Sequence, residues 1–153
     1  MHAEQPGVDV TSDFEVYAAI GRFVFWFSKL EGMLKADLAG LLDLEVNHMD
    51  PVVSAFDFAQ LVSVLKAIKL KGCDEEAKPR IERFFKECMK MNDHRVRVVH
   101  GDWTLNGVRV VSRGSREPAI HFANPDELVK LSERCEKLAV GYYPPITFTF
   151  TVR

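Results

Sequence analysis

Apolar residues recur at spacings of three and four along most of the chain, which predicts four helices. The longest run predicts a helix over residues 13–43, and Phe25 and Trp26 give this helix a second apolar side. A helix that is apolar on two sides must be covered on both, so we expect a second subunit to cover one of them. Shorter apolar runs predict helices over residues 55–71, 76–99 and 125–140, with residues 44–54 as a connection.

The third predicted helix carries an arginine where its apolar pattern requires a core residue. That pattern consists of Ile81, Phe84, Cys88, Met91, Arg95 and Val98. A guanidinium cannot lose its proton, and burying it without a partner is costly. Either a carboxylate therefore meets Arg95, or this side of the helix faces a polar cleft. Glu31, on the inner side of the first helix, is the best carboxylate candidate for a structural ion pair.

The pattern changes from helical to alternating after Gly101, which we expect to end the third helix in the left-handed conformation. Asn106-Gly107 favours a two-residue turn, so a β-hairpin is predicted over residues 103–112. The cross-strand pairs that follow from this turn are Leu105 with Val108 and Trp103 with Val110.

The whole chain is predicted to form one mainly helical domain, because 153 residues suit a single hydrophobic core. Residues 1–11 are polar and are expected to form a flexible arm. Residues 119–122 predict a third strand, and residues 144–153 an extended tail that includes a short C-terminal strand. The predicted fold class is a four-helix bundle with a β-hairpin between the third and fourth helices.

Composition and cysteine usage narrow the classes of protein. The formal net charge is -2, so a nucleic-acid site must come from local clustering of charge. The cysteines are odd in number and far apart, which favours reduced thiols in the cytoplasm over a disulfide framework or a zinc site. The sequence shows no signal peptide and no apolar stretch of the length that spans a bilayer.

Arginine is concentrated in one part of the chain. Between Arg95 and Arg116 the sequence contains five arginines and one acidic residue, Asp102. Such a cluster suits contacts with phosphate groups, although it is equally typical of a solvated hairpin face. The side chains that we assign to RNA contact are Arg97, Arg109, Arg113, Arg116 and Trp103.

His100 lies in the last turn of the third predicted helix, where two influences oppose each other. The exposed carbonyl groups of a helix end favour a protonated imidazole, and the neighbouring Arg95 and Arg97 disfavour it. A histidine in this balance is suited to give or take a proton near neutral pH. The alternative is a histidine that only caps the helix carbonyls.

The Arg95-x4-His100 spacing, followed by Gly101, resembles the hallmark of the HEPN superfamily of helical nucleotide-binding domains. The likeness covers roughly residues 13–141. Other matching features are Trp26, Leu30 and Glu31 of the first helix, Gly101-Asp102-Trp103, and the hairpin before the last helix. The resemblance implies a metal-independent ribonuclease without a cofactor, in which two copies of the chain bring their motifs into one cleft.

The resemblance also implies the roles of the site residues. His100 would move a proton of the ribose 2′-hydroxyl or of the leaving 5′-oxygen, and Arg95 would hold the scissile phosphate. Glu31, Asn92 and Asp93 would support this pair. Many such nucleases are toxins or defence effectors, so an antitoxin or a nucleotidyltransferase-like partner is implied as well.

A second class of function remains open. Active members of the superfamily commonly carry asparagine directly after the motif arginine, and this chain carries Val96. The alternative is therefore a catalytically inactive helical homodimer that binds a nucleotide, an RNA or a protein partner. No metal-ligand spacing, glycine-rich phosphate loop or nucleophile elbow favours any other enzyme class.

Overall fold

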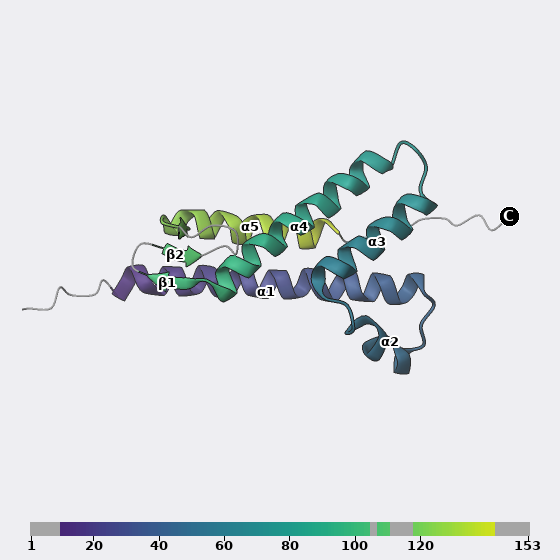
Figure 1. Cartoon of the computed structure of the whole chain (residues 1–153), viewed down its shortest axis with the longest axis horizontal. Helices are drawn as coiled ribbons and strands as arrows, with labels where there is room; N and C mark the ends of the chain where they lie inside the picture. The colour runs from purple at the N-terminus through teal and green to yellow at the C-terminus, as the bar shows by residue number, and fades with distance from the viewer. Residues whose placement is uncertain (1–9, 105–106, 111–117, 143–153) are drawn as a thin grey trace, which may run out of the picture.

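The structure is a mainly helical fold with a small sheet between its last two helices (Figure 1). The computed structural model describes residues 10–104, 107–110 and 118–142. Its helices are α1 (Val10–Leu41), α2 (Val46–Val53), α3 (Phe58–Gly72), α4 (Lys78–His100) and α5 (Pro125–Gly141). The strands β1 (Asp102–Thr104), β2 (Gly107–Val110) and β3 (Ala119–His121) form one antiparallel sheet in the order β1-β2-β3. The described residues thus confirm a helical class with a hairpin before the last helix.

The long helix α1 forms the centre of the fold. α5 runs beside it in the same direction, and α3 and α4 cross it diagonally (Figure 1). The inner side of α1 is buried as its apolar spacing predicted. The α1 side chains in the core are Ala19, Phe23, Phe27, Leu30, Leu34 and Leu38. The other helices add apolar faces that include Leu61, Leu65, Ile81, Leu128 and Leu131.

The segment predicted as a connection contains a helix. α2 spans Val46–Val53 and includes Pro51, which removes one backbone donor and normally disfavours a helix interior. The cost is small here because α2 is short and loses only one potential hydrogen bond of its ladder. Burial of Val53 fixes the end of the helix against the core. The prediction for residues 44–54 was therefore wrong.

The core register of α4 differs from the prediction at one position. Phe85 is buried, whereas the predicted Phe84 is half-buried and stacks on Tyr142 with ring centroids 4.9 Å apart. Both phenylalanines lie three or four residues from Ile81 and from Cys88, so the spacing alone fits either. The packing of α5 beside α4 decides between them.

The hairpin is present but its register is shifted. Trp103 pairs with Val108 and Thr104 pairs with Gly107, so the turn comes one residue earlier than predicted. Gly107 has φ +108°, a conformation that other residues rarely adopt. The predicted third strand is confirmed, with Val108 opposite His121. Leu105 and the strand predicted at the C-terminus lie outside the described residues.

The last helix begins as its sequence predicted. The Asn124 side chain accepts a hydrogen bond from the backbone N–H of Asp126 at 2.9 Å, and Pro125 occupies the first helical position. This start directs α5 back along α1, where Arg22 and Glu136 form an ion pair. The pairing of the first and last helices closes the core.

A buried ion pair lies between α1, α3 and the end of α5. The Nζ of Lys69 lies 2.7 Å from Asp37, and the two side chains are 3% and 15% exposed. The Tyr142 hydroxyl donates a hydrogen bond to the same carboxylate. Burial, with this hydrogen bond to Asp37, raises the pKa of the Tyr142 hydroxyl far above its usual range. The tyrosine therefore stays a neutral donor to Asp37.

Within the described ranges, no single helix is both long and apolar enough to cross a bilayer. The α2–α3 pair meets that requirement only when the two helices are taken together across a bend of 117°.

Candidate functional site

The motif arginine and histidine meet at the C-terminal end of α4. The Nη1 atom of Arg95 lies 3.5 Å from the Nε2 atom of His100, at the long end of hydrogen-bonding range. If the guanidinium donates to Nε2, that nitrogen carries the lone pair and the imidazole proton is on Nδ1. Arg95 is half-buried and His100 is exposed. An imidazole nitrogen and a guanidinium therefore lie side by side at the surface.

The predicted ion pair between Arg95 and Glu31 is not formed. Glu31 pairs instead with Lys35, one turn further along α1, at 2.6 Å. Among the described residues, no carboxylate lies within ion-pairing distance of Arg95. The arginine resolves its inward-facing position differently, because its long side chain extends along the last turn of α4 to His100. Its positive charge is thus left available to an anion from outside.

Gly101 ends α4 for a reason that the sequence pattern did not predict. Its φ of -76° and ψ of 156° are extended, so the predicted left-handed cap is wrong. A Cβ atom at this position would lie 2.1 Å from the Val108 side chain and 2.5 Å from the Arg97 carbonyl oxygen. The glycine is required by close packing of β2 on the helix end, and this packing fixes the hairpin beside His100.

Trp103 fixes the hairpin further. Its indole N–H donates to the carbonyl oxygen of Val98 at 2.9 Å, and the Gly101 N–H donates to Arg97 at 2.9 Å. Two of the carbonyl groups that a helix end leaves unpaired are satisfied in this way. The Trp103 ring also stacks on Phe122 at a centroid distance of 6.4 Å. Trp103, predicted to contact RNA, is half-buried and used in anchoring the sheet.

A second histidine, His94, is half-buried on α4 directly before Arg95. The ring of His94 lies 5.9 Å from that of Phe122, and its Nδ1 atom is buried without a hydrogen-bond partner in the described structure. Burial, together with the charges of Arg97 and Arg134, holds the pKa of His94 below its usual value. The imidazole is therefore neutral at pH 7, and its proton can be placed on either nitrogen.

The other predicted site residues are distributed around this helix end. Asn92 and Arg97 are half-buried on α4, and Asp93 is exposed beside them. Arg109 is exposed on β2, directly opposite Asp102 of β1. Arg113 and Arg116, the remaining predicted RNA contacts, lie outside the described residues.

Exposed apolar side chains flank the motif. Val96 and Val99 are 44% and 46% exposed, on the α4 turns that carry Arg95 and His100.

In the part of the chain that the structure describes, no three His, Cys, Asp or Glu side chains are grouped so as to hold a metal ion. Comparisons with protein-family models, with curated proteins and with solved structures gave no match.

The sequence interpretation missed part of this site. His121 is not among the predicted site residues, yet it pairs with Val108, which packs on the end of α4 at Gly101. Phe122 beside it lies against His94, with ring centroids 5.9 Å apart. Phe122 itself has φ 56°, an uncommon conformation for a bulky residue. The only available signal was the register of the sheet, because pairing of Val108 with His121 carries β3 to the end of α4.

Proposed function

We propose that this protein is a metal-independent endoribonuclease of the HEPN type, with Arg95 and His100 as its catalytic residues. The observation that carries the proposal is the contact between these two side chains at an exposed helix end. Arg95 has no carboxylate partner among the described residues, so its charge is available to a phosphate. A histidine nitrogen beside an available guanidinium is the minimum set for cleaving RNA, whose own 2′-hydroxyl is the nucleophile.

The proposed reaction uses each group once. When the Arg95 guanidinium turns from His100 to the phosphate, the Nε2 lone pair of His100 is free to take the proton of the ribose 2′-hydroxyl, and the 2′-oxygen forms a bond to the adjacent phosphorus. The bond from phosphorus to the 5′-oxygen breaks, and the imidazolium of a second copy's His100, or water, protonates that oxygen. The Arg95 guanidinium donates to the phosphate oxygens, where negative charge builds up. The products are a 2′,3′-cyclic phosphate and a free 5′-hydroxyl.

The outer side of α1 supports the homodimer that this reaction uses. Phe14, Tyr17 and Phe25 are 71%, 67% and 53% exposed, on the side of α1 away from the core. Exposed aromatic side chains gathered on one helix side commonly mark an interface. Val96 and Val99 supply a smaller apolar surface beside the motif itself. Sedimentation of the full chain as a strict monomer at high micromolar concentration would remove the dimer from the proposal.

The test of the function is incubation of the purified protein with mixed RNA in EDTA. We expect cleavage that survives the chelator and leaves 2′,3′-cyclic phosphate ends. Replacing His100 by Ala should lower the rate by about 10²- to 10⁴-fold while RNA binding changes little. Unchanged cleavage by the His100→Ala variant would exclude the catalytic assignment.

A second candidate function is a catalytically inactive homodimer that binds a nucleotide, an RNA or a protein partner. The observation that favours it is Val96, an exposed apolar residue where active relatives of this type commonly have asparagine. Wild-type protein that binds RNA but leaves it intact under all conditions would favour this function. In either case a toxin or defence role, with an antitoxin or nucleotidyltransferase-like partner, is a proposal for genetic tests.

A further inference from the structure

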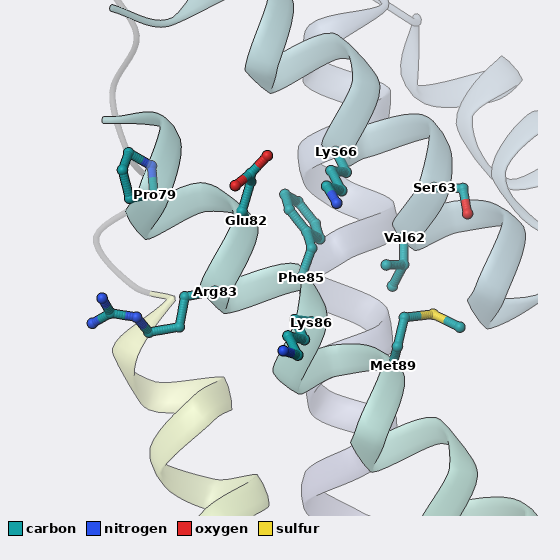
Figure 2. A pocket seen from close by; sticks show the side chains of 9 residues that line it. All are labelled: Val62, Ser63, Lys66, Pro79, Glu82, Arg83, Phe85, Lys86 and Met89. Atoms are coloured by element: carbon teal, nitrogen blue, oxygen red, sulfur yellow. The ribbon is translucent and has the colours of Figure 1, made fainter. Parts of the chain in front are cut away.

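A groove lies between α3 and α4, at the opposite end of α4 from the motif. Its volume is about 700 Å³, and Figure 2 shows the Phe85 ring between the two helices that form its walls. Val62 and Phe85 are almost fully buried, so they close the bottom of the groove. Ser63, Lys66, Pro79, Glu82, Arg83, Lys86 and Met89 complete the lining.

The lining of the groove carries three cations and one acidic side chain. Lys66 comes from α3, and Arg83 and Lys86 come from α4 (Figure 2). Within the described residues, none of the three is within ion-pairing distance of a carboxylate. Glu82 is the only acidic residue in the lining. Cations that no internal carboxylate neutralises attract an external anion, and the open shape suits an extended ligand.

The charge continues along α4 toward the motif. Arg83, Lys86, Lys90 and Arg97 are separated by three, four and seven residues, so they lie along one side of the helix. Glu87 neutralises Lys90 in the middle of this line. Lys86 and Arg97, the cations on either side of the neutralised Lys90, are about 16.5 Å apart along the helix at 1.5 Å per residue. Arg97 lies three residues, about one helical turn, before His100 on this side of α4, so a chain of phosphates that starts at the motif can reach the groove.

We propose that the groove between α3 and α4 binds backbone phosphates of the RNA strand whose scissile bond lies at Arg95 and His100. This inference rests on the proposed function and adds a second contact region to it. Lys66, Arg83 and Lys86 hold the strand through its phosphates. The contact is independent of base sequence, and it orients the strand along α4.

The test compares two triple variants of the full chain. The groove variant is Lys66→Ala with Arg83→Ala and Lys86→Ala. The control variant is Lys71→Ala with Lys130→Ala and Lys137→Ala, which removes the same charge from exposed positions outside the groove. The probe is a fluorescent 20-nucleotide 2′-O-methyl RNA, which lacks the nucleophile and stays intact. Circular dichroism melts confirm that both variants are folded.

The groove variant should bind the probe at least about tenfold more weakly, and its salt dependence should fall by about 2 in log–log slope, since each lost phosphate contact removes about 0.7. The control variant should change affinity by less than about threefold, because distant charges are screened at 0.15 M salt. Equal effects of the two variants would overturn the groove proposal. A poly-glutamate peptide that binds as tightly as the RNA, through the same three residues, would also overturn it.

The outcomes separate this inference from the proposed function. Wild-type protein that does not bind the probe overturns both. Weak binding by the groove variant supports the groove even if His100→Ala leaves cleavage unchanged, in which case only the catalytic assignment fails. If the wild type cleaves RNA and the groove variant has unchanged KM and kcat, the groove proposal fails and the function remains.

Discussion

Lys69 and Arg95 are both cations on the inner sides of their helices, and the structure accommodates them in different ways. Lys69 is buried and meets Asp37, whose carboxylate also accepts the Tyr142 hydroxyl. Arg95 reaches out of the fold to His100 and meets no carboxylate among the described residues. The first cation is explained by the packing of the core, because its charge is matched inside the molecule. The second has a charge that no carboxylate of the described residues matches, so it is available to an external anion.

The comparison teaches that an inward-facing charge points to function only when the fold does not neutralise it. A buried ion pair is costly to break, yet it contributes little that an apolar pair would not. An unmatched guanidinium beside a histidine has no such structural explanation. The two regions should therefore respond differently to substitution, one in stability and the other in activity.

The largest expected effect is on the Lys69 region. Replacing Asp37 by Ala should lower the free energy of unfolding by about 3–5 kcal/mol, because the buried ammonium loses its carboxylate. Urea unfolding measures this change. The control is Asp93→Ala, at an exposed position of α4, which should shift the unfolding free energy by no more than about 0.5 kcal/mol. Similar losses for the two variants would mean that the Lys69 pair is not a stabilising contact.

The second prediction concerns Arg95. Replacing it by Lys should slow RNA cleavage by roughly 10²-fold, because an ammonium cannot make the planar, multiple contacts of a guanidinium with a phosphate. The free energy of unfolding should change by less than about 1 kcal/mol, since no internal ion pair is lost. Arg22→Lys, at the arginine of α1 that pairs with Glu136 of α5, is the matched control and should retain full activity. A large loss of stability in Arg95→Lys would show that Arg95, like Lys69, stabilises the fold.

A smaller effect is expected at the junction between α4 and the hairpin. Gly101→Ala should destabilise the protein by about 1–3 kcal/mol, because its Cβ would overlap Val108 and a backbone carbonyl. Gly32→Ala is the control, since open space surrounds that position in α1. The free energy of unfolding of the control should rise by up to about 1 kcal/mol, because alanine favours a helix interior more than glycine does. Thermal melts compare the two, and equal shifts would show that the hairpin can move away from the helix end.

The smallest effect is the pH dependence that His94 causes. Its pKa in the folded protein lies below the ordinary value of about 6.5, chiefly because the ring is buried. Below pH 6.5 the unfolded chain takes up a proton that the folded chain resists, so stability should fall as the pH is lowered. The free energy of unfolding of the His94→Gln variant, measured by urea unfolding, should fall less steeply between pH 7 and pH 5. The control is His48→Gln at an exposed position, whose unfolding free energy should depend on pH as the wild type's does. The same pH dependence in His94→Gln would contradict this assignment.

The sequence predicted most of the fold because helical spacing, the Asn124 cap and the change of period after Gly101 are local signals. It missed α2, where Pro51 indicated a loop and the burial of Val53 outweighed it. It also could not choose between Phe84 and Phe85, because both fit the spacing of the core. These errors share a cause, which is that packing between helices decides what local preference leaves open.

The candidate site was predictable only in part for the same reason. The spacing of Arg95 and His100 along one helix end was visible, and the structure brings the two side chains together. The expected partner Glu31 depended on how α1 lies against α4, and it pairs with Lys35 instead. His121 and Phe122 reach this region through the register of the sheet, which the turn signal placed one residue too late.

The close packing of α5 along α1 has a consequence for the order in which the protein can be made. These helices come from opposite ends of the described chain, and Arg22 and Glu136 are paired across them. Among these helices, α1 leaves the ribosome first and α5 last. The side of α1 that α5 covers therefore stays exposed while α2, α3 and α4 emerge. Contacts of such long sequence separation form slowly. The motif helix α4 therefore gains its final surroundings only after α5 has been synthesised.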